Sequence, residues 1–153
     1  MSPNVGLFLE TYQRIDKAYR KYFLSRLAHY GFTPNEIVVI LFLYNNAPEA
    51  DTATDIAKRK GISKGLITRS VESLCRKDVL EAVRDTKDRR IIHLRLKNSH
   101  SEMAAELEKI QRIFFREIEK NISPEDIEIT RRTLCSLLNN AESFSDRRES
   151  YAD

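Results

Sequence analysis

The chain has 153 residues, of which 41% are hydrophobic and 32% charged, with only 4 glycines and 4 prolines. This length suits one domain with a core of its own, and the composition is typical of a helix-rich globular protein rather than a disordered or all-β one. The longest apolar run, residues 37–44, is too short to span a bilayer, and the N-terminal sequence lacks the features of a signal peptide. We therefore expect a cytoplasmic protein with no membrane association.

The formal net charge of +3 is distributed unevenly along the chain. Residues 52–97 carry thirteen Lys or Arg against six Asp or Glu, a net charge of +7, whereas residues 1–51 are neutral and residues 98–153 carry −4. A charge run is usually a solvated face. A cationic block inside a mildly acidic chain is also what phosphate recognition requires, because contacts between basic side chains and phosphates release condensed counterions.

Two helices are predicted before the cationic block. Apolar residues recur at three- and four-residue steps over residues 8–30, and Gly31 is a suitable C-terminal stop. Thr33 and Glu36 have the spacing of a capping box, with a proline between them at the first helical position. They open a very apolar second helix that extends to about residue 46 and is expected to be central to the core.

Two short helices joined by a tight corner are predicted from Ala53. Ile56 and Ala57 belong to the inner face of the first of them. Gly61 can end that helix in a left-handed conformation, and Ser63 can cap the next. Four apolar residues are predicted to form the inner face of the second helix: Leu66, Ile67, Val71 and Leu74. This order is typical of a helix-turn-helix, although a simple helical hairpin can have the same pattern.

A β-hairpin is predicted after this motif, because the hydrophobic period changes from about 3.6 to about 2 residues. Residues 79–83 and 91–96 alternate in character and fit two strands, with the polar residues 84–90 at the tip between them. A hairpin in this position is a wing. The expected fold class is therefore mainly α, with a winged helix-turn-helix lobe whose small antiparallel wing has two or three strands.

Two further helices are predicted at the C-terminal end. Ser99 and Glu102 can form a capping box at the start of a long helix, which Asn121 closes. Ser123 and Pro124 then supply the cap and first-turn proline of a last helix.

The terminal helices carry apolar stripes that are too large for so small a lobe to bury alone, and such a stripe marks an association surface. We expect a single domain, 1–153, that forms a homodimer. In this organisation residues 1–31 and 99–144 form the helical dimerisation region, residues 33–97 the winged DNA-binding lobe, and residues 145–153 a frayed tail.

The order of elements and several motifs resemble the MarR family of bacterial transcriptional regulators. The likeness rests on Asp55-Ile56-Ala57, on residues 62–69 and 71–74, and above all on Asp88-Arg89-Arg90 followed by alternating apolar residues. The tripeptide is weak evidence alone and strong evidence between two strands after a helix-turn-helix. The resemblance covers nearly the whole chain and implies a dimer with intertwined terminal helices. A two-fold dimer presents its recognition helices about 34–36 Å apart, so its target is an inverted repeat.

The second helix of the motif supplies the residues expected to contact base edges. Lys64 and Arg69 suit guanine, Thr68 suits a thymine methyl group or a phosphate, and the helix N-terminus favours phosphate. The alternatives are that Ser63 is only a cap, Gly65 only a close-packing residue and Lys64 only a solvated cation. The predicted recognition set is Ser63, Lys64, Gly65, Thr68 and Arg69.

The wing tip is expected to contact the minor groove, where the potential is most negative and one extended arginine fits. The family resemblance implies Arg90 in that role. Asp88 would orient its guanidinium through a charge-assisted pair, and Lys87 and Arg89 would contact phosphates. The alternative is a solvated turn with ordinary surface ion pairs.

The remaining chemistry-bearing residues indicate no further site. Cys75 and Cys135 lie in apolar helical patterns and are expected to be buried free thiols. The three histidines have no metal-ligand spacing, so a structural metal site and a cofactor are not expected, and a regulatory metal held by residues distant in sequence stays an open alternative. The reactive N-terminal cysteine of peroxide-sensing family members has no counterpart, because the first cysteine is Cys75.

The predicted function is that of a transcriptional regulator, a repressor, which binds double-stranded DNA sequence-specifically. The resemblance also implies a crevice for a small aromatic or phenolic effector. Tyr12, Tyr19, His29 and Tyr30 are candidates to line it, although aromatic residues at helical spacing more often belong to a core. The alternative is a winged-helix interaction module or antirepressor that does not itself read DNA. An enzyme is not expected, because the sequence has no nucleophile elbow or phosphate-binding glycine loop.

Overall fold

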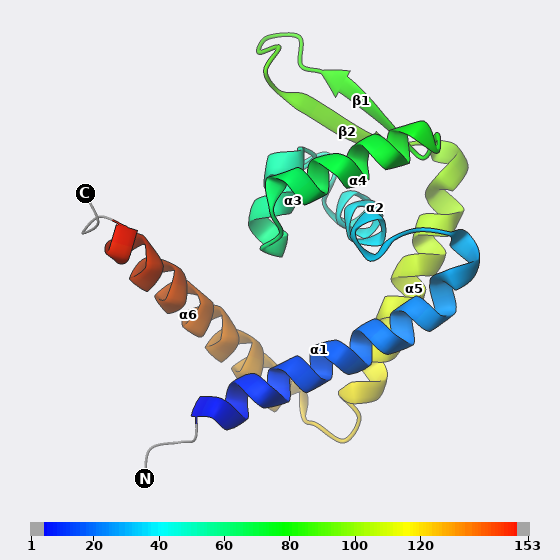
Figure 1. Cartoon of the computed structure of the whole chain (residues 1–153). Coiled ribbons are helices and arrows are strands. Elements are labelled where there is room, and N and C mark those ends of the chain that lie inside the picture. The colour runs from blue at the N-terminus through cyan, green and yellow to red at the C-terminus, as the bar shows by residue number, and fades with distance from the viewer. Residues whose placement is uncertain (1–4, 150–153) are drawn as a thin grey trace. The chain divides into compact units, whose positions relative to one another are not determined.

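The computed structural model describes the backbone of residues 5–149 and the side chains of residues 7–145. Within these residues the chain forms six α-helices and one two-stranded antiparallel sheet (Figure 1). It divides into two compact units, residues up to Phe114 and residues from Phe115 onward. The predicted fold class is confirmed, and the wing has two strands. None of the helices in the described part of the chain has both the length and the apolar character needed to cross a membrane.

The second helix begins and ends where its sequence signals predict, and Gly31 ends the first helical segment as predicted, although that segment begins before residue 8. Helix α1 (Val5–Leu27) continues as a short 3-10 turn, and Gly31 terminates it in the left-handed region at φ 66°. Helix α2 (Pro34–Asn46) begins with a complete capping box. The Glu36 amide donates to Thr33 Oγ1 over 3.3 Å, and the Thr33 amide donates to Glu36 Oε2 over 2.7 Å.

Helices α3 (Ala53–Lys60) and α4 (Lys64–Arg76) form the helix-turn-helix, with Gly61 at φ 62° between them. The predicted inner face of α4 is correct for Ile67, Val71 and Leu74, which are buried, and wrong for Leu66, which is 45% exposed. Successive helical residues are about 100° apart around the axis, so Leu66 lies off the stripe that begins at Ile67.

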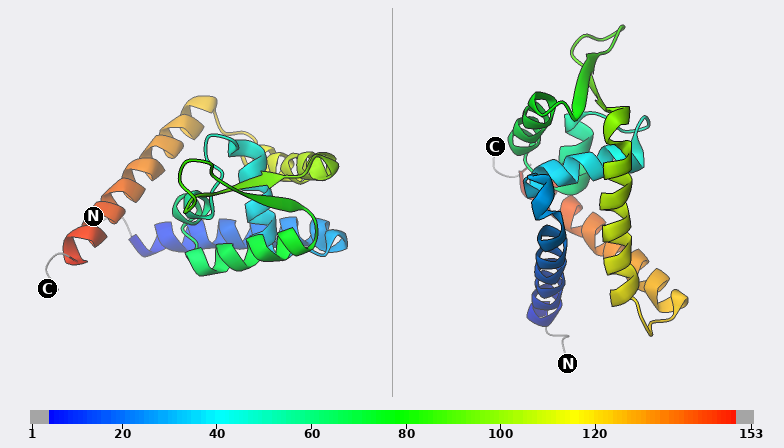
Figure 2. Two further views of the ribbon diagram at one scale, coloured as in Figure 1. Left: turned by 90° about the horizontal axis from the view of Figure 1, so that it is seen from above. Right: turned by 90° about the vertical axis from the view of Figure 1, so that its right-hand side faces the viewer.

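Strands β1 (Leu80–Arg84) and β2 (Ile92–Leu96) pair antiparallel, with Ala82 opposite Leu94. The hairpin that they form projects beyond the helices of the same unit (Figure 2). At its base, the Leu94 amide donates to the Asp51 carbonyl over 2.8 Å. This bond attaches β2 to the segment that precedes α3.

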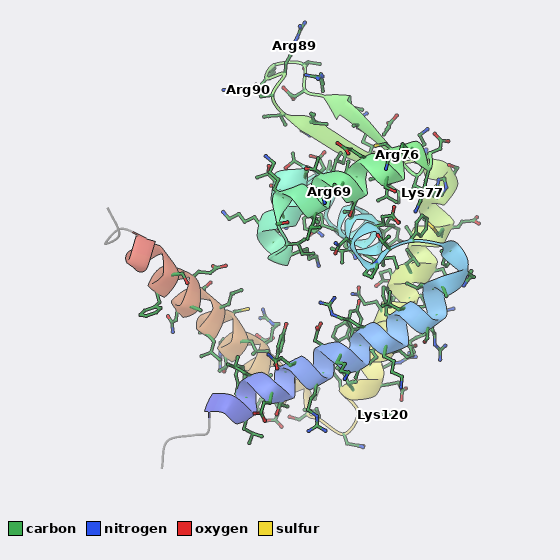
Figure 3. All side chains as sticks on the ribbon, viewed as in Figure 1. Arg69, Arg76, Lys77, Arg89, Arg90 and Lys120 are labelled. Atoms are coloured by element: carbon green, nitrogen blue, oxygen red, sulfur yellow. The ribbon has the colours of Figure 1, made fainter. Side chains whose placement is uncertain are left out.

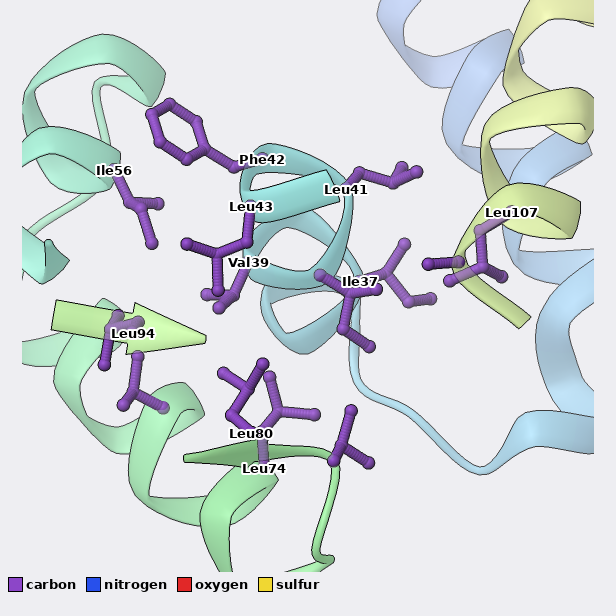
Figure 4. Close-up of a cluster of buried hydrophobic side chains, with 14 of the residues drawn as sticks. Ile37, Val39, Leu41, Phe42, Leu43, Ile56, Leu74, Leu80, Leu94 and Leu107 are labelled. Atoms are coloured by element: carbon purple, nitrogen blue, oxygen red, sulfur yellow. The ribbon is translucent and has the colours of Figure 1, made fainter. Parts of the chain in front are cut away.

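The core of the first unit surrounds α2, which buries residues on nearly its whole circumference. Side chains from α3, α4, both strands and α5 converge on it (Figure 4). The largest fully buried side chains include Phe42, Leu27, Ile40, Leu43, Ile56, Ile67, Leu74, Leu80, Leu94 and Leu107. Helix α4 and the wing are therefore held on one core.

The C-terminal helices differ from prediction in three respects. The prediction of a capping box at Ser99 is wrong. The Ser99 hydroxyl lies 3.0 Å from His100 Nδ1. A 3-10 turn covers Asn98–His100, and α5 (Ser101–Ile118) begins after this turn. Helix α6 (Pro124–Glu149), capped by Ser123, continues past the predicted end at residue 144, and residues 150–153 lie outside the described part. Cys135 is exposed rather than buried, and Cys75 is half-buried.

Candidate nucleic-acid interface

The N-terminal half of α4 presents an exposed polar face. All five predicted recognition residues, Ser63, Lys64, Gly65, Thr68 and Arg69, are exposed, while the opposite face of α4 packs into the core. Ser63 does cap the helix, since its Oγ accepts from the Leu66 amide over 3.4 Å. A Cβ atom at Gly65 would meet nothing within 4 Å, so the close-packing alternative for this glycine is wrong within the chain.

The wing tip holds one arginine in a fixed orientation. Arg90 donates from Nε to Asp88 Oδ1 and from Nη2 to Asp88 Oδ2, each over 3.0 Å, and its amide also donates to Oδ1 over 3.0 Å. These hydrogen bonds from Arg90 hold the pKa of Asp88 below its usual value. The Arg90 side chain is nevertheless 91% exposed. The predicted Asp88–Arg90 pair is thus present, and it leaves the guanidinium accessible at the end of the hairpin (Figure 3).

The loop that carries this pair is ordered by a second aspartate. Asp85 Oδ1 accepts the backbone amides of Lys87 and Asp88, each over 2.7 Å. Arg84 donates to the Arg89 carbonyl over 3.3 Å. The backbone hydrogen bonds from the Asp88 and Lys87 amides lower the pKa of Asp85. The wing tip is therefore a bonded turn, in which Lys87 and Arg89 are exposed.

A hollow of about 770 Å³ lies between the helix-turn-helix and the wing. Lys64 and Thr68 of α4 line it from one side and Arg90 from the other. These three predicted residues therefore face a common space. The other predicted residues, Ser63, Gly65, Arg69, Lys87, Asp88 and Arg89, do not line it.

Sequence reasoning missed His93, which lies on β2 with a carboxylate at each ring nitrogen. Its Nδ1 is 2.7 Å from Asp51 Oδ1, and its Nε2 is 3.3 Å from Asp85 Oδ2. The hydrogen bond to Asp51, followed by that to Asp85, raises the pKa of His93 above its usual value. The two carboxylates thus contact different nitrogens of the ring. Within the described residues, no three side chains are grouped so that they could hold a metal ion.

An ion pair with a buried carboxylate joins the C-terminal end of α4 to the start of α2. Lys77 Nζ lies 2.8 Å from Glu36 Oε2 and 2.9 Å from Oε1, and it also donates to the Gly31 carbonyl over 3.3 Å. The Glu36 side chain is 2% exposed and that of Lys77 is 39% exposed. This ion pair fixes the C-terminal end of α4 to the start of α2.

A recognition-type helix with an exposed polar face, followed by a two-stranded wing with an arginine at its tip, defines the winged helix-turn-helix class. Residues 30–91 match the model of the MarR family. The matched segment spans most of the winged lobe, which agrees with the family resemblance that its motifs predicted.

Solved structures share the fold. S. aureus MepR in its DNA-binding conformation has a TM-score of 0.82 at 18% identity, covering 88% of this chain and 98% of that one. The transcriptional regulator PA3341 has a TM-score of 0.80 at 20% identity, covering 89% and 98% respectively. The S. aureus MepR–DNA complex has a TM-score of 0.76 at 18% identity, covering 87% and 97%. No curated protein sequence matches the chain.

Proposed function

We propose that this protein is a cytoplasmic, homodimeric transcriptional repressor that binds an inverted repeat in double-stranded DNA. The observation that carries the proposal is the bidentate Asp88–Arg90 pair at the wing tip, which orients an exposed guanidinium beside the polar face of α4. A preoriented arginine loses little conformational entropy when it enters a groove. The repressor role is proposed on the family resemblance.

The two parts of this surface suit different grooves. Helix α4 would enter the major groove, where Lys64 and Arg69 can bond guanine and Thr68 can contact a thymine methyl group. Exposed Gly65 leaves room for the DNA backbone to approach the helix closely. Arg90 would enter the minor groove, and Lys87 and Arg89 would bond phosphates on either side. The S. aureus MepR–DNA complex, which shares the fold, supports DNA as the partner.

The proposed dimer rests on apolar side chains that each unit leaves exposed. On α1 they are Leu7, Phe8, Leu9, Tyr12 and Ile15, and on α6 they are Leu134, Leu137 and Leu138. Single exposed apolar residues are ordinary, but rows of them along one helix mark an association surface. Tyr19 and Tyr30, by contrast, make internal contacts with Phe23 and Glu106, which fits the core interpretation of these rings. Release by a small aromatic or phenolic effector stays part of the proposal, on the family resemblance alone.

Replacing Arg90 by alanine tests the proposal. We expect Arg90→Ala to weaken binding to a duplex selected from a random pool by at least about tenfold, measured by fluorescence anisotropy. The log–log slope of affinity against salt concentration should become shallower by about one unit, because the variant displaces one counterion fewer from the DNA. The dimer and its melting temperature should not change.

Arg112→Ala is the matched control, because Arg112 is also an exposed arginine paired with a nearby carboxylate, Glu108. It lies on α5, away from the wing, and should bind as the wild type does. Equal affinities for Arg90→Ala and the wild type would refute the role of the wing. The non-DNA-binding alternative would be supported if the wild type bound no duplex even at low salt.

A further inference from the structure

The ring of His93 bridges two segments of the lobe. Asp51 belongs to the segment between α2 and α3, whereas Asp85 opens the wing tip, and each places a carboxylate oxygen at one ring nitrogen. A second hollow, distinct from the one between the helix-turn-helix and the wing, is lined by His93, Asp51 and Asp85. The charged side chains of Arg84 and Arg95 line it as well. The His93 side chain is 32% exposed, so it can exchange protons with solvent.

Both contacts can be hydrogen bonds only when the ring is an imidazolium. An ionised carboxylate accepts and cannot donate, and a neutral imidazole has a single N–H. With Nδ1 and Nε2 both facing carboxylates, a neutral ring must turn a lone pair toward one of them. The geometry therefore selects the cation, and the raised pKa of His93 agrees with it.

Asp85 connects this bridge to the wing arginine. Its other oxygen accepts the amides of Lys87 and Asp88, and the Asp88 carboxylate in turn accepts three hydrogen bonds from Arg90. A shift of the Asp85 carboxylate therefore shifts the peptide groups on which the Asp88–Arg90 pair is built.

We propose that His93 is a positioning residue for DNA binding: as an imidazolium bridged between Asp51 and Asp85, it fixes the wing turn that presents Arg90. This inference rests on the proposed function and adds a dependence on pH to it. Below the pKa of His93 both bonds are present and the turn is fixed. As the pH rises through that pKa, the ring loses a proton, the shorter bond to Asp51 is retained, and the Nε2 lone pair repels Asp85. The turn loosens and the affinity for DNA falls.

The DNA arm of the test uses a duplex recovered from a random pool by the wild-type protein, with anisotropy measured from pH 6 to pH 9 at constant salt. Coupling between two sites typically changes affinity by roughly 5- to 150-fold, and we expect about tenfold weaker binding at the alkaline end. His93→Gln should bind at every pH as the wild type does at pH 9. His100→Gln, which alters a histidine outside the wing, should keep the wild-type profile.

Asp51→Asn separates positioning from simple charge. The substitution makes the protein more positive, so a charge effect alone would strengthen DNA binding. Positioning predicts the reverse near neutral pH, because removal of the Asp51 carboxylate lowers the pKa of His93 and moves the midpoint of the affinity profile to lower pH. Stronger binding by Asp51→Asn throughout, or a wild-type pH profile in His93→Gln, would overturn the proposal.

A second arm needs no DNA. In NMR titrations of the wild-type protein, the amide resonances of Lys87 and Asp88 should move with the same midpoint as the His93 ring. Amide resonances of Lys87 and Asp88 that do not titrate with the midpoint of the His93 ring would overturn the inference. This outcome would hold even if the variants failed to fold. A wild type that binds no duplex at any pH, while its amides follow the ring, would refute the proposed function and leave the wing coupling intact.

Discussion

Replacing Glu36 by glutamine should destabilise the lobe without changing its shape. The carboxylate is buried and accepts from the Lys77 ammonium, the Thr33 amide and the Ser73 hydroxyl. A hydrogen bond to a charged group contributes about 1.5–3 kcal/mol, and removal of one partner of a fully buried pair costs about 3–5 kcal/mol. Lys77 is 39% exposed and can turn toward water, which reduces the contribution of the ion pair to the free energy of unfolding. We therefore expect Glu36→Gln to lower the free energy of unfolding by about 2 kcal/mol.

The pH dependence distinguishes this ion pair from a general packing defect. Burial alone would raise the pKa of Glu36, but the hydrogen bonds from Lys77, Ser73 and Thr33 outweigh it and lower the pKa below its ordinary value of 4.5. The stabilisation is therefore complete above that ordinary value and is lost as the pH falls through the lower folded value. The difference in stability between the wild type and Glu36→Gln should shrink on acidification.

Urea unfolding followed by circular dichroism measures this difference between pH 7 and pH 3. Lys77→Met and the double variant complete a cycle that isolates the pair from the capping role of Glu36. Glu102→Gln, which neutralises an exposed glutamate of α5, is the control and should unfold as the wild type does. Wild-type stability in Glu36→Gln, or a constant difference over the whole pH range, would refute the reasoning.

Two further substitutions test the core and the dimer. Ile67→Ala should cost about 2–5 kcal/mol in urea unfolding because Ile67 is fully buried, whereas Leu66→Ala at the adjacent exposed position should change stability by no more than about 0.5 kcal/mol. Similar changes in both variants would contradict the assigned orientation of α4. Leu138→Glu, at a side chain that is 58% exposed on α6, should convert the proposed dimer to monomer in sedimentation velocity. If Leu138→Glu remains a dimer, Leu138 does not belong to the interface.

The sequence predicted best those features that depend on a few neighbouring residues. The capping box links Thr33 and Glu36, three positions apart, and the wing pair links Asp88 and Arg90, two positions apart. The left-handed conformation of Gly61 depends on that residue alone. The failures needed tertiary information. Ser99 had a suitable partner in sequence, but its hydroxyl bonds His100 instead, and the periodic pattern around Cys135 could not reveal that this thiol is exposed.

The contacts of His93 with the two aspartates could not be predicted from neighbouring residues for the same reason. Asp51 and His93 lie 42 positions apart, and only the attachment of β2 beside the segment before α3 brings them together. Strand alternation placed His93 in the wing but gave no partner for its ring. Lys77 is similar, since it lies 41 positions from Glu36 in the sequence and no local pattern pairs the two.

The bond from the Leu94 amide to the Asp51 carbonyl belongs to the main chain, so no substitution at position 51 other than one that distorts the backbone removes it. The same residue thus anchors the strand through its peptide group and tunes the acidity of the histidine through its side chain. Relatives could exchange the carboxylate for a neutral or apolar group and shift the pH range of the wing without detaching it. Mutational libraries at position 51 should accordingly yield folded lobes with graded pH responses.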